Sequence, residues 1–486
     1  MLLILLEYHG EVGIEPWEYM LGVLYVMAMY LYYGRKKKMN IKLHPEYKYF
    51  ISGFLAKIVG AVFFALIYFY YYKNGDTISY FYSGVAMNKM LLIDPVEYFR
   101  QVFLGDNSAR ALNQYSAQSI LPWSYVFTDG RTFQAVRISA LLSTVTFNSY
   151  LLSSLIMATF SFAGIWACYR TFVSYFPQLT GQLAIGFLFM PSAIFWGSGI
   201  MKDTFTFSAA CGWVYAVDEV FFKRRNVVSR TVLIVFCAAV MIKIKPYIFM
   251  VLLPATLLWL LYMRVVRLRN ILVRFVLIPL LALVLVSLSI FILSRMGDMF
   301  DKFALDDALG NIQNIQSDLS SNDAYGSNKF DIGEFDGTWT GVLGKFPIAT
   351  NAALFRPYLW ETRNAVTALS GLENLFVLVL TIYVLAKAGL RFFFRAIASN
   401  PLLMMSMTFA LLFAFVVGIT TPNFGALVRF KIPMVPFYIS SLFIVLYLHK
   451  EREQARRKGV HFDLTKYRVP PAAMAAGQQG HKAGNG

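Results

Sequence analysis

Charged residues are scarce in this sequence. Only 15% of its 486 residues are charged and 58% are apolar, whereas about a quarter of an average soluble protein is charged. Too little polar material remains to cover a water-soluble surface, so the composition predicts an integral membrane protein. It excludes disorder and nucleic-acid binding for the chain as a whole, although the formal net charge is +17.

Cysteine and histidine are also scarce. The three cysteines, Cys168, Cys211 and Cys237, lie in apolar stretches without CxxC spacing, which excludes a disulfide framework and a zinc site. The five histidines lie near the termini or in a basic loop, so histidine general-base chemistry and a Ser-His-Asp triad lack a partner. Carboxylates, lysines, arginines and tyrosines remain as candidate catalysts.

Long apolar runs are abundant. A spanning helix needs about 20 mostly apolar residues, and the sequence offers eleven candidates. They are 17–33, 50–72, 150–169, 182–196, 204–222, 231–242, 247–263, 275–293, 365–386, 402–419 and 433–448. The predicted fold is therefore an all-α polytopic transmembrane helix bundle of about 11 spans, with a range of 10–12.

The basic residues predict the orientation, because short cytoplasmic loops carry an excess of Lys and Arg. The basic clusters at 35–38, 223–230, 264–274, 387–395 and beyond 450 fall on one side if the N-terminus is outside. The prediction is a membrane domain at 1–448 and a basic cytoplasmic tail at 449–486, disordered at its end.

Two long segments then lie outside the membrane, at 73–148 and 295–364. The first contains aromatic and apolar stretches, 98–104 and 133–147, that fit helices lying in the membrane interface. The second is acidic, with ten carboxylates against four cations between 296 and 361. These two extracytoplasmic loops are expected to carry the function.

The stretch 231–263 is interrupted by Lys243, Ile244, Lys245 and Pro246. Two short crossing helices explain it best, because a single kinked helix would export the arginines at 264–274. Short helices of this kind turn beside membrane binding sites. The alternative is one kinked helix with a snorkelling lysine.

A carboxylate follows the second predicted span. Asp76 lies in Lys-Asn-Gly-Asp-Thr at 73–77, and the segment continues through Tyr80. A partly desolvated carboxylate at the membrane surface suits a general base acting on a hydroxyl. The alternative is a Gly-Asp turn that caps an interfacial helix.

Further charged residues are expected on the same outer side. Lys202 and Asp203 are adjacent opposite charges after a run of small residues, and boundary ionisable residues are functional candidates; a self-neutralising structural pair is the alternative. Lys243 and Lys245 are cations on the side opposite to most others, which suits a lipid phosphate or pyrophosphate.

Two arginine-containing segments complete the candidate site. One contains Arg356, Trp360 and Glu361, and the other contains Asn423 and Arg429. Arginine binds phosphate in a bidentate manner. The aromatic residues near Arg356 offer either sugar-stacking faces or ordinary interface anchors.

These residues carry a resemblance to a known family. The segment Gly-Asp-Thr-Ile-Ser-Tyr-Phe around Asp76, together with the hydropathy of most of the chain, resembles polytopic GT-C class glycosyltransferases. Members of that class use lipid-phosphate-linked sugar donors and have an essential acidic residue in the first large extracytoplasmic loop. The segment from Asn423 to Phe437 also looks like the last outer loop of bacterial envelope-polysaccharide membrane proteins.

The resemblance implies roles for individual residues. Asp76 would deprotonate or orient the acceptor hydroxyl, with Asp203 as a second catalytic candidate. Substrate-binding candidates are Tyr80, Lys202, Lys243, Lys245, Arg356, Trp360, Glu361, Asn423 and Arg429. The chain departs from the family in having only Asp76 where many members have paired acids in the first loop, and in having an extra span at 17–33, so the donor and metal dependence stay open.

The resemblance implies a hexosyltransferase-type enzyme of the bacterial inner membrane, active in envelope glycan synthesis. It would transfer a sugar from a polyprenyl-phosphate-linked donor to a glycan, lipid or protein acceptor on the extracytoplasmic face. No metal ligands are assigned and no cofactor is required, with a divalent metal left open. The alternatives are an envelope polysaccharide polymerase, which the acidic loop favours, and a transporter or flippase of a lipid-linked or anionic solute.

Overall fold

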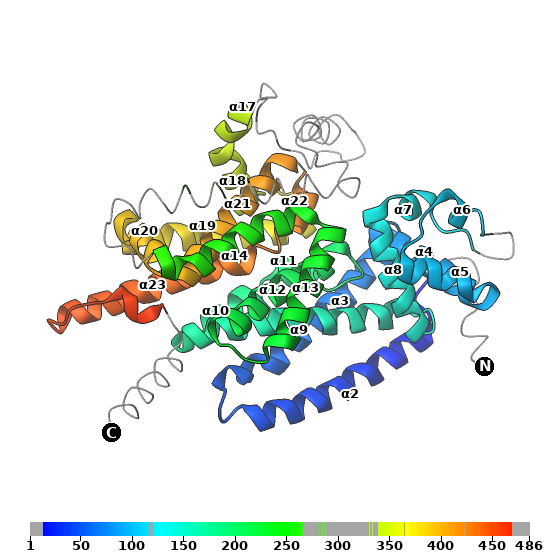
Figure 1. The fold of residues 1–486 in the computed structure, drawn as a ribbon, viewed down its shortest axis with the longest axis horizontal. Helices are drawn as coiled ribbons and strands as arrows, with labels where there is room; N and C mark the ends of the chain where they lie inside the picture. Colours follow the sequence, from blue (N-terminus) through cyan, green and yellow to red (C-terminus); the bar gives the residue numbers. More distant parts are fainter. Residues whose placement is uncertain are drawn as a thin grey trace. The chain divides into compact units, whose positions relative to one another are not determined.

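The computed structural model describes residues 13–115, 120–265, 339–363, 365–421 and 423–468, and the single positions 280, 284, 287, 330 and 333. This part of the chain is helical and contains no strand (Figure 1). The prediction of an all-α fold is thereby confirmed for the described residues. Apart from positions 280, 284 and 287, the predicted span 275–293 lies outside them, as does most of the acidic loop.

Five described helices are long and apolar enough to cross a membrane. They are Pro45–Tyr72, Tyr150–Tyr175, Val227–Ile244, Thr367–Ala388 and Pro401–Thr420. A sixth crossing is formed if Phe424–Phe430 and Val435–Arg457, which are bent by 67°, count as one span. The chain is therefore a multi-pass membrane protein, and the structure supports about half of the eleven predicted spans.

The predicted span 182–196 is wrong as a single helix. The structure has two short helices there, α10 (Thr180–Leu188) and α11 (Pro191–Trp196). Pro191 causes the break, because proline has no N–H to donate and pushes the preceding residue out of helical geometry. The helix is therefore interrupted at 189–190, where a continuous crossing was expected.

Other predicted spans are helical but fall short of a crossing. The run 17–33 lies in α2 (Pro16–Asn40), which is long enough but rich in tyrosine. The run 204–222 corresponds to α12 (Lys202–Val217) and the π-helix η5 (Asp218–Phe222). The interruption at 243–246 separates α13 (Val227–Ile244) from α14 (Pro246–Val265), as predicted.

The described chain forms two compact units, which are considered separately. Unit 1 consists of Met1–Ala167, Ala193–Trp213 and Val235–Pro246, and unit 2 consists of Cys168–Ser192, Val214–Ile234 and Tyr247–Gly486. The helix α9 (Tyr150–Tyr175) contributes residues to both.

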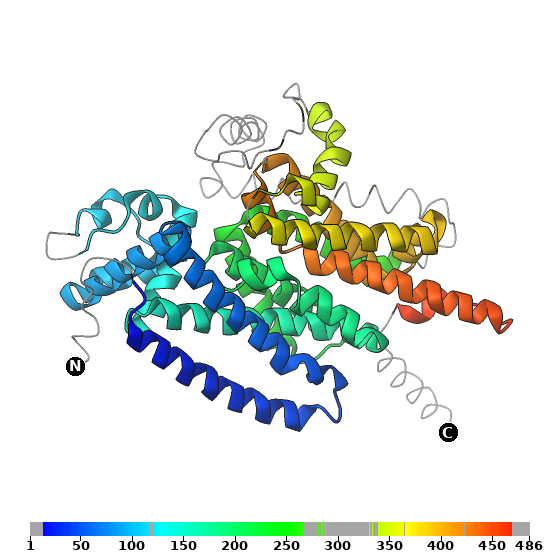
Figure 2. The ribbon, with the colours of Figure 1, turned by 180° about the vertical axis from the view of Figure 1, so that it is seen from behind.

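Unit 1 combines membrane-crossing helices with a group of shorter helices. The first crossing is built from η1 (Pro45–Tyr49), α3 (Phe50–Leu66) and the π-helix η2 (Ile67–Tyr72). The predicted loop 73–148 is folded into α4 (Asp76–Ile93), α5 (Pro95–Phe99), η3 (Arg100–Leu104), α6 (Ala109–Leu112), α7 (Ser124–Thr128) and α8 (Gly130–Val145). Figure 2 shows α4 turning away from the line of α3.

The helices α4 and α8 pack closely. A Cβ on Gly84 would lie 2.8 Å from the backbone nitrogen of Ala140, so only glycine permits this approach. The N-terminus of α2 is fixed to the start of α9, where the buried Glu18 carboxylate accepts hydrogen bonds from the Ser149 hydroxyl at 2.6 Å and the Leu151 N–H at 3.0 Å. These contacts hold the helix ends of unit 1 together.

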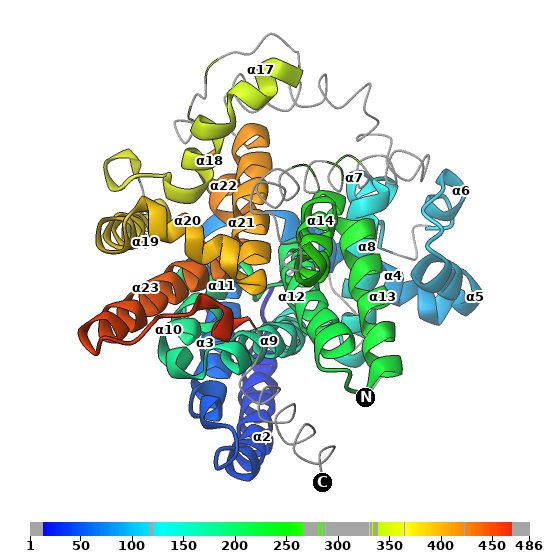
Figure 3. The same cartoon turned by 60° about the vertical axis from the view of Figure 1, so that its left-hand side comes forward.

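Unit 2 is built around α19 (Ala365–Ala388), α21 (Pro401–Thr420) and α23 (Val435–Arg457), which pack side by side (Figure 3). Besides α10 and η5, the described shorter helices of this unit are η4 (Pro177–Leu179), α17 (Trp339–Gly344), α18 (Phe346–Phe355), η8 (Leu359–Glu361), α20 (Leu390–Ser399), α22 (Phe424–Phe430) and η9 (Leu464–Tyr467). A Cβ on Gly418 of α21 would lie 2.0 Å from the Ala349 carbonyl oxygen of α18.

Candidate functional site

Asp76 is the first residue of α4. Gly75 precedes it at φ +132°, and a Cβ there would lie 2.6 Å from the ring of Tyr68, so this turn requires glycine. The Asp76 carboxylate is half-buried at a helix N-terminus, where the helix dipole favours negative charge. The position is compatible both with the predicted base and with the alternative role in a helix start.

Tyr80 lies one turn after Asp76 and faces Lys202. Residues four apart share a helix face, so Asp76 and Tyr80 point in similar directions from α4. The Lys202 ammonium is 5.8 Å from the centre of the Tyr80 ring. It donates a hydrogen bond to the Thr132 hydroxyl at 2.5 Å and lies 3.8 Å from the Asp129 carboxylate. Two predicted site residues are thus brought together by α4, α8 and α12.

Asp203 and Lys245 form a buried ion pair. Lys245 lies between α13 and α14, outside both helices, and its ammonium donates to the Asp203 carboxylate. Both side chains are buried, whereas Lys243 is exposed. Each helical step turns by about 100°, which explains why two lysines two residues apart point in different directions. The structure therefore separates Lys243 from the other predicted site residues of unit 1.

Lys57 is a buried cation that the sequence analysis missed. Its ammonium donates to the backbone carbonyl oxygens of Ala193, at 3.0 Å, and Gly197, and lies 5.8 Å from the centre of the Phe207 ring. Among the described residues no carboxylate lies within ion-pair distance of it. Lysine donates in this way to the carbonyls at a helix C-terminus, so Lys57 holds the end of α11 and the turn that leads to Lys202.

The predicted site residues of unit 1 that the structure brings together lie at one end of the membrane-crossing helices. The crossing Pro45–Tyr72 ends just before Asp76, and the hydroxyls of Thr77 and Tyr150, where α9 begins, are 2.7 Å apart. Lys245 follows the C-terminus of the crossing Val227–Ile244. We call Asp76, Tyr80, Lys202, Asp203 and Lys245 the helix-end cluster.

The predicted residues Arg356 and Glu361 of unit 2 pair with each other. The Arg356 Nε donates to both Glu361 oxygens, at 3.0 and 3.1 Å, and a second guanidinium nitrogen also reaches this carboxylate. The guanidinium carbon lies 4.6 Å from the Phe330 ring centre and 5.4 Å from that of Phe424. Much of the binding capacity of Arg356 is therefore used within the protein.

Trp360 is 76% exposed and stacks on Tyr358, with ring centres 4.9 Å apart. A stacked exposed pair suits a sugar face or the membrane interface, the two interpretations that the sequence offers. Asn423 has a local role, because its side chain accepts from the Ala426 N–H at 3.2 Å and caps α22. The guanidinium carbon of Arg429 lies 5.4 Å from the Phe430 ring centre.

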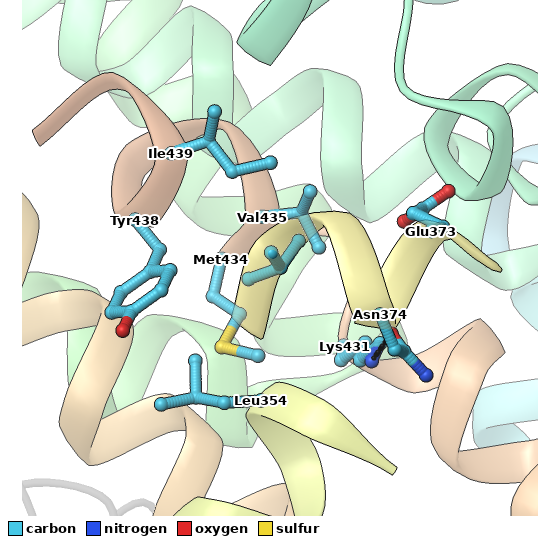
Figure 4. Close-up of a pocket in the computed structure, with 9 residues that line it drawn as sticks. Leu354, Glu373, Asn374, Lys431, Met434, Val435, Tyr438 and Ile439 are labelled. Atoms are coloured by element: carbon cyan, nitrogen blue, oxygen red, sulfur yellow. Dashed lines mark hydrogen bonds between the residues drawn. The ribbon is translucent and has the colours of Figure 1, made fainter. Parts of the chain in front are cut away.

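The sequence analysis also missed a group of buried polar residues in unit 2. The Glu373 carboxylate accepts from the Ser192 N–H at 2.6 Å and from the Ser192 hydroxyl at 2.5 Å. The Lys431 ammonium donates to the Asn374 side-chain oxygen at 2.6 Å. Figure 4 shows Glu373, Asn374 and Lys431 beside a largely apolar cavity of about 10 Å³, room for about one water molecule.

The sequence did contain a signal for the missed residues. Lys57 and Glu373 are single charged side chains inside apolar runs that were predicted to span, and intramembrane charges are functional candidates by default. No three His, Cys, Asp or Glu side chains converge as metal ligands in the part of the chain that the structure describes.

Comparisons of the chain with models of protein families, with curated proteins and with solved structures found no match.

Proposed function

We propose that this chain is a GT-C type glycosyltransferase that transfers a sugar from a polyprenyl-phosphate-linked donor to an acceptor on the extracytoplasmic face. The observation that carries the proposal is the helix-end cluster. It combines a half-buried carboxylate, an aromatic ring and a partly exposed ammonium at one end of several crossing helices. A lipid-linked phosphate sugar presents its reacting bond at this depth.

The proposed step divides the cluster between acceptor and donor. The Asp76 carboxylate accepts the proton of the acceptor hydroxyl as its oxygen bonds to the anomeric carbon. The bond from that carbon to the phosphate oxygen breaks, and its electrons leave with the polyprenyl phosphate. The Lys202 ammonium, which lies beside the Tyr80 ring, stabilises the charge of the departing phosphate.

Asp203 has a different proposed role from that implied by the resemblance. Its carboxylate is buried and paired with Lys245, so it fixes the start of α12 and thereby the position of Lys202. We therefore propose that Asp203 and Lys245 position the donor site and do not contact the substrate.

The proposed membrane is the bacterial inner membrane, crossed about eleven times with the N-terminus outside and the C-terminus in the cytoplasm. The last turns of α2, at the opposite end of this helix from Asp76, carry Arg35, Lys36, Lys37 and Lys38, and Lys42 follows in the connection to α3. Because such residues favour the cytoplasmic side, the helix-end cluster is proposed to face outside.

A transporter of a lipid-linked or anionic solute is the second candidate. The buried pair of Asp203 and Lys245 at the interruption between α13 and α14 favours it, because transporters bind solutes where helices are discontinuous. The polymerase alternative depends on the acidic loop, which lies outside the described residues.

The test is sugar transfer by purified protein in liposomes, offered a panel of polyprenyl-phosphate and polyprenyl-diphosphate sugars. The wild type is expected to transfer sugar from one of these donors. Asp76→Asn keeps the side-chain shape but removes the base, so transfer from that donor is expected to be lost. Asp94→Asn is the matched control, because Asp94 caps α5 through hydrogen bonds of 3.1 Å and asparagine caps equally well.

Equal turnover by the wild type and Asp76→Asn would contradict the assignment of Asp76 as the base. Absence of turnover with every donor, together with movement of a lipid-linked or anionic solute across the liposome membrane, would replace the transferase with the transporter.

A further inference from the structure

The segment formed by α5 and η3 buries two polar side chains beside Tyr98 and Val102, and it exposes several large apolar side chains. Glu97 and Gln101 are 4% and 0% exposed, whereas Val96 and Leu104 are 73% and 81% exposed. A helix on a water-facing surface shows the opposite pattern, with apolar residues toward the core. The medium outside this segment is therefore expected to be apolar.

Hydrogen bonds fix the inward orientation. The Gln101 amide nitrogen donates to the Glu97 carboxylate at 3.1 Å, and the Tyr115 hydroxyl donates to the Gln101 side-chain oxygen at 2.5 Å. Arg110 donates to the same carboxylate at 3.3 Å. Arg137 donates to the Val102 carbonyl oxygen at 2.6 Å. Rotating the segment to hide its apolar side would break all of these contacts.

The outward side chains form a continuous row, which we call the apolar stripe. It consists of Leu92, Val96, Phe99, Phe103 and Leu104, each at least half exposed. Val96 and Phe99 of α5 and Phe103 of η3 are three and four residues apart and share one face, whereas Leu92 lies near the end of α4, before the break at Asp94. The rings of Phe99 and Phe103 stack with centres 5.4 Å apart.

A chain of hydrogen bonds sets the depth of the segment relative to the membrane. The hydroxyls of Tyr98 and Thr144 are 3.0 Å apart, and the latter donates to the Asn88 side chain at 2.9 Å. Asn88 donates to the Asn148 side-chain oxygen at 2.9 Å. Asn148 lies two residues before the crossing helix α9 begins at Tyr150, so α5 is held at the level where a membrane crossing ends.

We propose that α5 and η3 lie in the surface of the lipid bilayer, with the apolar stripe among the acyl chains. Lipid is favoured over a protein partner because the same unit contains membrane-crossing helices and the hydrogen bonds hold the stripe at the level where the crossing α9 ends. Arg100 is about half exposed beside the stripe, where its apolar stem can lie along lipid and its guanidinium can reach the headgroups. This inference does not depend on the proposed function.

The test is spin labelling of the full chain in lipid nanodiscs that contain one copy each. A nitroxide is attached at Val96→Cys, Phe99→Cys or Phe103→Cys, and collision rates with oxygen and with a water-soluble nickel chelate are measured. Asn113→Cys, at an exposed position in the same group of helices, is the control. The native cysteines are buried and are replaced by alanine if they react with the label.

The three stripe positions are expected to show an oxygen-to-nickel collision ratio several-fold higher than Asn113→Cys. Ratios equal to the control would overturn the proposal, because the stripe would then face water. Low collision rates with both reagents would also overturn it, because the stripe would be covered by protein. Neither result would test the proposed role of Asp76 as the base in sugar transfer.

Discussion

At the scale of single residues, two buried lysines of unit 1 are stabilised in different ways. Lys245 is paired with the carboxylate of Asp203, whereas Lys57 donates to two backbone carbonyl oxygens. An ion pair in a dry environment depends on both partners, because each charge is costly when the other is removed.

We predict that Lys245→Met destabilises the protein by about 3–5 kcal/mol, because it leaves the Asp203 carboxylate buried without its counter-charge. The double variant Asp203→Val with Lys245→Met is expected to recover most of that loss. Denaturant unfolding of the single and double variants in detergent micelles measures both. If the double variant loses as much free energy of unfolding as the two single variants lose together, the two side chains are not coupled.

The sequence also offers Arg356 and Arg429 as phosphate-binding candidates. If Arg429 binds the donor phosphate, Arg429→Ala raises KM for the lipid-linked donor about tenfold with little change in kcat, the pattern for loss of a binding contact. Arg356→Ala is predicted to raise KM and also to lower the melting temperature, because its pairing with Glu361 is lost. Steady-state kinetics and thermal unfolding separate the two effects. Unchanged donor dependence in both variants would remove the phosphate-binding role.

At the scale of helices, close contacts depend on small side chains. Gly418→Ala is predicted to destabilise the protein by about 1–3 kcal/mol, because the added Cβ would meet the Ala349 carbonyl oxygen and force α18 and α21 apart. Gly34→Ala in α2 is the matched control, since no atom lies within 4 Å of its added Cβ. Thermal unfolding is expected to show a lowered melting temperature for Gly418→Ala and an unchanged one for Gly34→Ala.

The connection after η3 is predicted to respond to acid. Hydrogen bonds from Ser108 and Arg110 lower the pKa of Asp106 to about 2, from an ordinary value of 3.8. A carboxyl group with a lowered pKa stabilises the fold fully above its ordinary pKa, and the stabilisation is lost as the pH falls through the lowered value. Protection of residues 106–112 from hydrogen exchange should therefore fall between about pH 4 and about pH 2.

Asp106→Asn is the control for this acid response. Its exchange protection, corrected for the intrinsic rate at each pH, is expected to be lower throughout and independent of pH in this range. The same pH dependence in both proteins would assign the response to another group.

At the scale of the whole molecule, the proposed topology is testable with single cysteines. Asn74→Cys, beside Asp76, is predicted to react in intact cells with a membrane-impermeant maleimide. Lys458→Cys, beyond α23, is predicted to react only after the cells are opened. Labelling of both positions from outside would contradict the proposed orientation and the odd number of crossings.

Composition and periodicity were sufficient to predict the helical class, the membrane location and the interruption before Pro246. They predicted one crossing helix at 182–196, where the structure has two short helices, because the hydropathy of an apolar run is the same whether its helix is continuous or breaks at Pro191. The partnership of Asp203 with Lys245 joins helices far apart in the sequence, so no local pattern predicts it. The exposure of Lys243 follows from helix geometry once its helix is known to extend to Ile244.

Lys57 has a consequence for the biogenesis of the protein. A lysine at the centre of a spanning helix costs about 2.5–3.5 kcal/mol during membrane insertion, and Lys57 lies near the middle of Pro45–Tyr72. Its two carbonyl acceptors belong to residues synthesised more than a hundred positions later. We therefore expect the nascent helix to lack these acceptors until α11 has been synthesised, so that its stable insertion depends on a later part of the chain.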